Sequence, residues 1–152
     1  MSDAPAALDD QDFMDALFDI VIPPSASGDM PGAGTLGLSA AVATALRADP
    51  LLGPLVEAGV QAVREAALTQ HPEGLPSMTP QAGTKVIEAQ LNSSHPLLIM
   101  GLARYLYAAY YQHPRILEGI GELPRPPFPE GFDVEETDAG LLEKLQARRK
   151  TL

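Results

Sequence analysis

Hydrophobic residues recur at every third or fourth position in the first part of the chain, which is the spacing of one face of an α-helix. In residues 10–22 this apolar stripe comprises Phe13, Met14, Leu17, Phe18 and Val21. Asp9 or Asp10 is a suitable N-cap for such a helix, and the pair Pro23–Pro24 cannot continue it. The pattern predicts a first helix that ends at Ile22, followed by a glycine-rich loop over 25–34.

The same spacing predicts two further helices, one over residues 36–48 and one that begins near Pro50. The second helix has an apolar stripe formed by Leu38, Val42 and Leu46. The third is expected to have Asp49 as its cap and to line one side with Leu52, Leu55, Val56, Gly59 and Val63. Because glycine lacks a Cβ, Gly59 indicates a close crossing with another helix.

Thr79 followed by Pro80 is a typical helix start and predicts a fourth helix with Val86, Ile87 and Leu91 facing inward. A fifth helix is predicted over residues 96–112. One of its faces carries Ile99, Met100, Ala103, Leu106, Tyr107, Tyr110 and Tyr111, and the opposite face carries Leu98, Leu102, Tyr105 and Ala109. Since this helix is apolar on almost every side, we expect it to be central in the fold.

The character of the chain changes after the fifth helix. Residues 119–137 are rich in proline and glycine and predict an extended arm, and residues 138–150 predict a last helix with Leu141, Leu142 and Leu145 on one side. Residues 1–8 are expected to be a flexible N-terminus. These elements predict an all-α fold, in which the 152 residues form a single compact helical domain of about five to six helices.

Composition narrows the classes of function. The net charge is −10, and the first 46 residues contain seven aspartates but no lysine or arginine, which makes nucleic acid an unsuitable partner. The basic cluster lies in the last turns of the predicted helix over 138–150, where cations offset the negative end of the helix dipole. It consists of Lys144, Arg148, Arg149 and Lys150. The absence of cysteine excludes disulfides, thiolate nucleophiles and iron–sulfur clusters.

The sequence offers no segment for membrane insertion, because its longest apolar run, residues 96–103, is too short to span a bilayer. The first residues also lack the basic and apolar parts of an export signal. As written, the chain is expected to be cytoplasmic. It would be periplasmic if it is exported with a partner, or if a signal segment is missing from the sequence.

No catalytic, cofactor-binding or metal-binding residue is assigned. His71, His95 and His113 each precede a proline, which places them at loop or helix boundaries, and none has the spacing of a metal motif. The sequence has no GxSxG nucleophile elbow.

The segment 105–116 contains all four tyrosines of the chain and is open to three interpretations. Tyr110, His113 and Arg115 could form a small-ligand pocket in a stand-alone enzyme or binding protein, or the tyrosines could belong to the core. The favoured interpretation is a protein interface, since tyrosine and arginine are enriched in interfaces. A homodimer that uses the same surface is a further alternative. The candidate partner-binding residues are Tyr110, Tyr111, His113, Arg115, Arg125, Pro127 and Phe128.

Three segments carry a resemblance to a known family: LFDIVIPPSASGDMPGAGTLGLSAAV (17–42), MTPQAGTKVIEAQLNSSHP (78–96) and YYQHP (110–114). In their order and spacing they resemble subunit 3 of the gluconate 2-dehydrogenase group, the small gamma subunit of bacterial flavin-dependent sugar and alcohol dehydrogenases. The resemblance covers roughly residues 13–132. Two features depart from the family pattern. The small subunit of the family often carries a twin-arginine export signal, but the only Arg–Arg pair here, Arg148–Arg149, is far from the start. The Gly-Tyr-Pro-Gly-like step expected after the tyrosines is replaced by residues 119–132.

The resemblance implies a helical, non-catalytic subunit without a cofactor of its own. In that family the large subunit is a glucose-methanol-choline-type oxidoreductase that carries FAD, and a cytochrome subunit can pass electrons onward. The small subunit binds the large one and supports its maturation. The resemblance therefore predicts an accessory subunit of an oxidoreductase complex, with FAD in the partner, no nucleic-acid partner and no direct membrane insertion.

Overall fold

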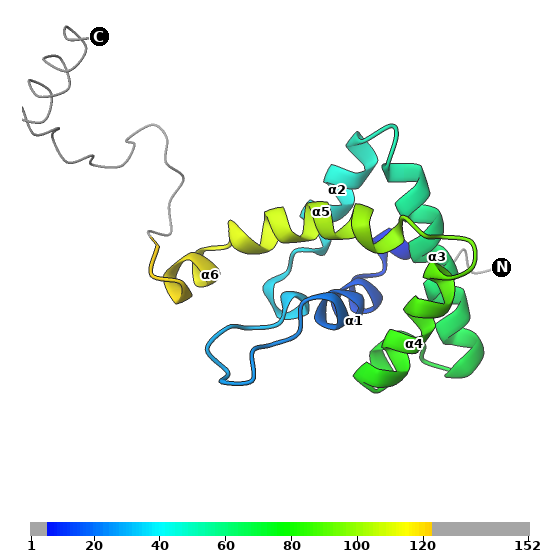
Figure 1. Ribbon diagram of the computed structural model, residues 1–152, viewed down its shortest axis with the longest axis horizontal. Coiled ribbons are helices and arrows are strands. Elements are labelled where there is room, and N and C mark those ends of the chain that lie inside the picture. The colour runs from blue at the N-terminus through cyan, green and yellow to red at the C-terminus, as the bar shows by residue number, and fades with distance from the viewer. Residues whose placement is uncertain (1–5, 123–152) are drawn as a thin grey trace, which may run out of the picture.

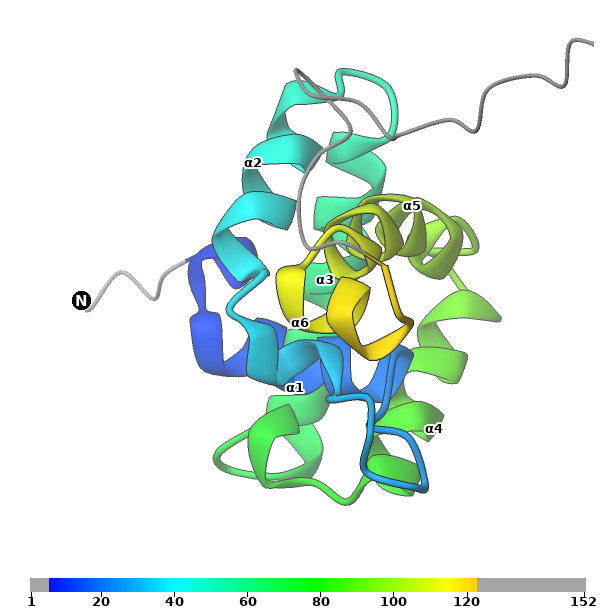
Figure 2. The ribbon, with the colours of Figure 1, turned by 90° about the vertical axis from the view of Figure 1, so that its left-hand side faces the viewer.

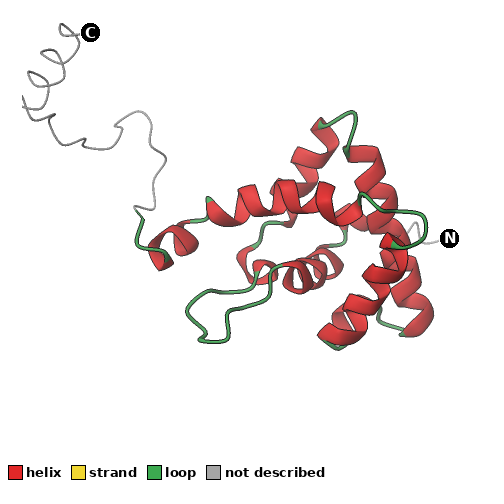
Figure 3. Cartoon of the chain, viewed as in Figure 1, coloured by secondary structure: helices red, strands yellow, loops and turns green. Residues whose placement is uncertain are grey.

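A computed structural model describes residues 6–122 of the chain, and within this range the fold is all-α (Figures 1 and 3). The predicted last helix, 138–150, and the arm beyond residue 122 lie outside the described residues. The α-helices are α1 (Gln11–Val21), α2 (Ser39–Ala48), α3 (Gly53–Gln70), α4 (Pro80–Leu91), α5 (Leu98–Tyr111) and α6 (Pro114–Gly119). Three short 3-10 helices are η1 (Ala7–Asp9), η2 (Ala33–Leu36) and η3 (Leu75–Ser77).

The helix starts follow the predicted capping chemistry. The Asp10 carboxylate accepts a hydrogen bond from the backbone N–H of Phe13, at 3.2 Å, and so caps α1. Thr79 does the same for α4 through the N–H of Ala82, at 3.3 Å, and Pro80 is the first residue of that helix. These side chains satisfy N–H groups that have no partner within their own helix.

Helix α1 is the central element of the core. It packs against α2, α4, α5, η1, η2 and η3, and Figure 1 shows it below α5. The side chains of Met14, Leu17 and Phe18 are fully buried. Leu38, Val42 and Leu46 of the second predicted stripe are also buried, as the helical spacing predicted.

A close crossing joins α3 to α5. A Cβ built on Gly59 would lie 3.0 Å from Leu98 Cδ1, and one built on Gly101 would collide with Val56 Cγ2. The glycines therefore allow the two helices to approach closely. The crossing predicted from Gly59 is confirmed, and Gly101 contributes to it from the other helix.

Three sequence expectations differ from the structure. Helix α3 begins at Gly53, after a turn that includes Pro50, and Leu55 is half exposed because it faces away from the buried side. The expected flexible N-terminus extended to residue 8, but Ala7 and Leu8 are buried in η1.

The short helix α6 occupies residues for which the sequence pattern predicted no element, between the fifth helix and the arm. The side chain of Ile116 anchors α6 and is fully buried. Figure 2 shows α6 beside the end of α5.

Candidate functional site

The four tyrosines of α5 divide into two that bind the fold together and two that face outward. Tyr110 is buried and Tyr105 is half-buried, whereas Tyr107 and Tyr111 are 46% and 53% exposed. Helix α5 packs against α1, α2, α3, α6 and η2, but it is not buried on every side. Its wheel is apolar nearly all round, but neighbouring helices cover only one side of it.

Tyr105 joins α5 to the connection between α2 and α3. Its hydroxyl donates a hydrogen bond to the carboxylate of Asp49, which also accepts the backbone N–H groups of Leu51 and Leu52, each at 2.9 Å. The Tyr105 hydrogen bond and these two N–H groups lower the pKa of Asp49, because all three favour the charged form. Asp49 therefore caps the turn that precedes α3, whereas the N-cap position of α3 itself is Leu52, so the predicted cap lies one turn earlier than the helix. Its bond to Tyr105 was not predicted.

Tyr110 holds α5 against the loop that precedes η2. Its hydroxyl donates to the carbonyl oxygen of Pro31 at 2.8 Å, and burial raises the pKa of the phenol. This loop is further fixed by Asp19, whose carboxylate accepts the Gly34 N–H at 2.8 Å. Tyr110 is therefore part of the core. It was predicted as a partner-binding residue, but it is buried and can act on a partner only through its contact with the exposed Tyr111.

The outward side of α5 forms a continuous exposed stripe, which we call the outer face. Its residues are three or four positions apart, so they lie on one side of the helix. They are Leu97, at the N-cap, and Met100, Arg104, Tyr107, Ala108 and Tyr111. An exposed row of this kind is typical of a surface that meets another chain segment.

The aromatic end of the outer face is preorganised. The Tyr111 ring meets the Tyr110 ring edge-on, with centroids 5.2 Å apart, and lies 6.3 Å from the Tyr107 ring at a tilt of 54°. Aromatic pairs at these separations attract each other. The buried Tyr110 therefore orients the exposed Tyr111, which lowers the side-chain entropy that Tyr111 would lose on binding.

The remaining candidate partner-binding residues lie at or beyond the start of α6. His113 caps this helix, since its Nδ1 atom accepts the Arg115 N–H at 3.3 Å, and the Arg115 side chain is exposed. Arg125, Pro127 and Phe128 lie outside the described residues. The structure thus places Tyr111, His113 and Arg115 near one end of α5, without assembling them into a pocket with Tyr110.

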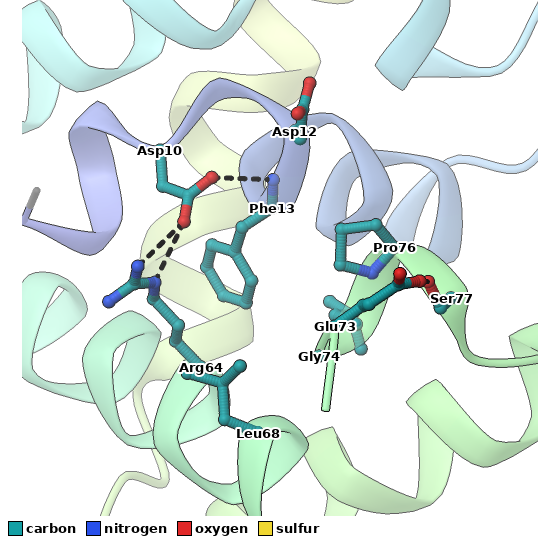
Figure 4. Close-up of a pocket in the computed structure, with 10 residues that line it drawn as sticks. Asp10, Asp12, Phe13, Arg64, Leu68, Glu73, Gly74, Pro76 and Ser77 are labelled. Carbon is teal, nitrogen blue, oxygen red and sulfur yellow. Dashed lines mark hydrogen bonds and ion pairs between the residues drawn. The ribbon is translucent and has the colours of Figure 1, made fainter. Parts of the chain in front are cut away.

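A cleft that sequence reasoning missed lies between α1, α3 and η3 (Figure 4). It has a volume of about 330 Å³. Arg64 forms an ion pair with Asp10 at 2.9 Å on its wall, with side-chain exposures of 15% and 26%. Asp12 and Glu73 also line the cleft (Figure 4). Residues so far apart in the chain gave no local signal of this pairing.

The acidic start of the chain serves the fold through specific partners. Asp9 pairs with Arg47 at 2.7 Å, and Asp15 accepts a hydrogen bond from the Ser39 hydroxyl. Together with the contacts of Asp10 and Asp19, these bonds join η1 and α1 to α2, α3 and η2. The aspartates that lower the net charge are therefore also links between helices.

Within residues 6–122, no three side chains of the metal-binding types gather closely enough to hold an ion. None of the helices in this range has both the length and the apolar character needed to cross a bilayer. No protein-family model matches the chain, and neither a curated protein nor a solved structure is detectably similar to it.

Proposed function

We propose that the chain is the non-catalytic small subunit of a flavin-dependent dehydrogenase, and that it binds the large subunit through the outer face of α5 and the start of α6. The observation that carries the binding role is the pair of exposed tyrosines, Tyr107 and Tyr111, beside Met100 on one stripe. Aromatic residues and methionine are enriched in protein interfaces.

The type of partner rests on the sequence resemblance to subunit 3 of the gluconate 2-dehydrogenase group. In this proposal FAD belongs to the large subunit, and the chain supports maturation of that subunit without a cofactor of its own. A cytochrome subunit is a further partner of the complex. The segment around Pro31 and Gly34, which carries part of the resemblance, is the loop that Tyr110 and Asp19 fix in place.

Co-expression with a flavoprotein dehydrogenase encoded beside this chain tests the proposal. A tag on the small chain should retain a complex with the absorption spectrum of bound flavin, and the large chain expressed alone should contain less flavin or be less soluble. Recovery of the small chain with no flavoprotein, together with normal flavin loading of the large chain alone, would refute it.

The same preparation separates the two alternative functions. A homodimeric module would have twice the mass of the chain at micromolar concentration, and it would lose that mass when Tyr111 is replaced by alanine. A small-ligand protein would stay monomeric and would need a cavity beside Tyr110, whose hydroxyl is already bonded to Pro31.

A further inference from the structure

The outer face of α5 differs in charge from the domain that carries it. Residues 6–122 contain thirteen acidic and five basic side chains, a net charge of −8. Two of the five cations, Arg47 and Arg64, form ion pairs. Arg104 lies in the middle of the outer face, and its guanidinium carbon is 6.0 Å from the centroid of the Tyr105 ring. Among the described residues, Arg104 and Arg115 have no ion-pair partner.

The chain itself contains a segment with the complementary composition. Residues 128–138, FPEGFDVEETD, hold five carboxylates and two phenylalanines without a single cation. Carboxylates pair with arginine through charge-assisted hydrogen bonds, and phenylalanine rings pack against tyrosine rings. Both chemistries are present on the outer face, in Arg104 and in Tyr107 and Tyr111.

The connection is long enough for this segment to reach the outer face. The described chain ends at Glu122, just after α6, which follows the Tyr111 end of α5. Ten further residues to Phe132 span at most roughly 33–36 Å. The outer face, from residue 97 to 111, is about 21 Å long at the rise of an α-helix. The acidic segment can therefore lie along the face without strain in the connection.

We propose that residues 128–138 dock in cis on the outer face of α5, with their carboxylates on Arg104 and their phenylalanines against Tyr107 and Tyr111. Weak contacts are sufficient, because the covalent connection between the segment and the domain makes docking intramolecular, with an effective concentration in the millimolar range. An intrinsic affinity near 1 mM would then leave about half of the molecules docked. A partner that binds the outer face must displace this segment, so docking lowers the apparent affinity of that partner.

Paramagnetic labelling of the full chain tests the docking directly, because the chain has no native cysteine. A nitroxide attached to Thr137→Cys should broaden the amide resonances of Met100–Tyr111 at low salt. Resonances of Leu75–Ser77, in the cleft wall that α5 does not line, should keep their intensity. Broadening of the α5 resonances should fall as salt rises from 50 to 500 mM, because exposed charge pairs are screened.

Two sets of variants separate specific pairing from random approach. E135Q/E136Q alters no residue of 6–122 and should lower the broadening of the α5 resonances roughly twofold or more. R104Q should lower it similarly, and the combined variant should show little additional loss if the same groups interact. K85Q, a neutralisation at an exposed cation on α4, is the matched control and should have no effect.

Three results would overturn the proposal. The first is the absence of α5 broadening in the unmodified full chain at 50 mM salt. The second is broadening that E135Q/E136Q and R104Q leave unchanged. The third is broadening that persists when labelled chains are mixed with separate isotope-enriched chains, since that result assigns the contact to a second copy. None of these measurements contains a dehydrogenase, so their outcome is independent of the proposed function.

Discussion

The hydroxyl of Tyr105 donates a hydrogen bond to the carboxylate of Asp49, 56 residues earlier in the chain. This bond joins α5 to the connection between α2 and α3. Tyr105 and Tyr110 therefore act as structural ties, which leaves Tyr107 and Tyr111 as the residues available to a partner.

Replacing Tyr105 with phenylalanine should lower the thermal midpoint of unfolding in a pH-dependent way. The pKa of Asp49 lies below its ordinary 3.8, so its stabilising contribution is present above that value and is lost as the pH falls through the lower, folded-state pKa. The hydrogen bond to Asp49 raises the pKa of Tyr105 above 10.0, so its contribution is lost as the pH rises through that raised value.

The difference in thermal midpoint between the native chain and Tyr105→Phe should therefore be largest near neutral pH. It should shrink at both extremes, which differential scanning fluorimetry across a pH series can measure. A constant difference from acid to alkali would show that the hydroxyl bond does not contribute.

Tyr110→Phe and Tyr111→Phe form a matched pair on adjacent residues. The first change removes the bond to the Pro31 carbonyl and should cost about 1 kcal/mol of unfolding free energy. The second should change stability little, since the Tyr111 hydroxyl has no hydrogen-bond partner among residues 6–122. Urea denaturation of both variants measures the difference, and equal stabilities would contradict the assignment of Tyr110 as the tie.

Gly101→Ala tests the close crossing of α3 and α5. Alanine favours a helix by about 1 kcal/mol over glycine, but the new Cβ would collide with Val56 Cγ2, and overpacking costs about 1–3 kcal/mol. We expect a net loss of stability. The double variant with Val56→Ala should be more stable than the sum of the single changes, with a coupling of roughly 1 kcal/mol.

Simple additivity of the Gly101→Ala and Val56→Ala changes in denaturant unfolding would argue against this contact.

Asp10→Ala should destabilise the domain more than Asp12→Ala. Asp10 caps α1 and also pairs with the partly buried Arg64, whereas Asp12 is exposed in the first turn. Loss of a cap costs about 0.5–2 kcal/mol, and an Arg64 without its partner adds to this cost. Chemical denaturation of the two variants gives the comparison. Similar losses for both would indicate that general acidity near the helix start, and not the specific Asp10 contacts, is what matters.

The apolar periodicity and the capping residues were enough to predict the fold class and five of the six α-helices in residues 6–122. Stripes such as Leu38, Val42 and Leu46 have only small residues between them, mostly alanine, so the large apolar side chains mark one side of the helical wheel. Helix α5 has no such contrast, and its wheel could not show which side would be left exposed. That side is decided by packing on α2 and α3, which only the three-dimensional structure provides.

The tyrosine contacts could not be predicted because each depends on a distant partner. Tyr110 meets Pro31 across 79 residues, and Arg64 meets Asp10 across 54. Helix α6 did have a local signal, since proline is favoured at the first position of a helix and His113 precedes Pro114 as the cap. Its short length and the glycines that follow concealed it.

The most direct test of the partner-binding role is the affinity of the full chain for the neighbouring flavoprotein subunit, measured by isothermal titration with paired variants. Tyr111→Ala with Met100→Ala removes aromatic and apolar area from the outer face, and Leu55→Ala is the control at a half-exposed residue on α3. Residues that contribute strongly to an interface cost 2 kcal/mol or more when truncated. We predict that Tyr111→Ala with Met100→Ala weakens binding by at least tenfold, while Leu55→Ala binds as the native chain does. Unchanged affinity of the outer-face variant, in a chain that still folds, would contradict this prediction.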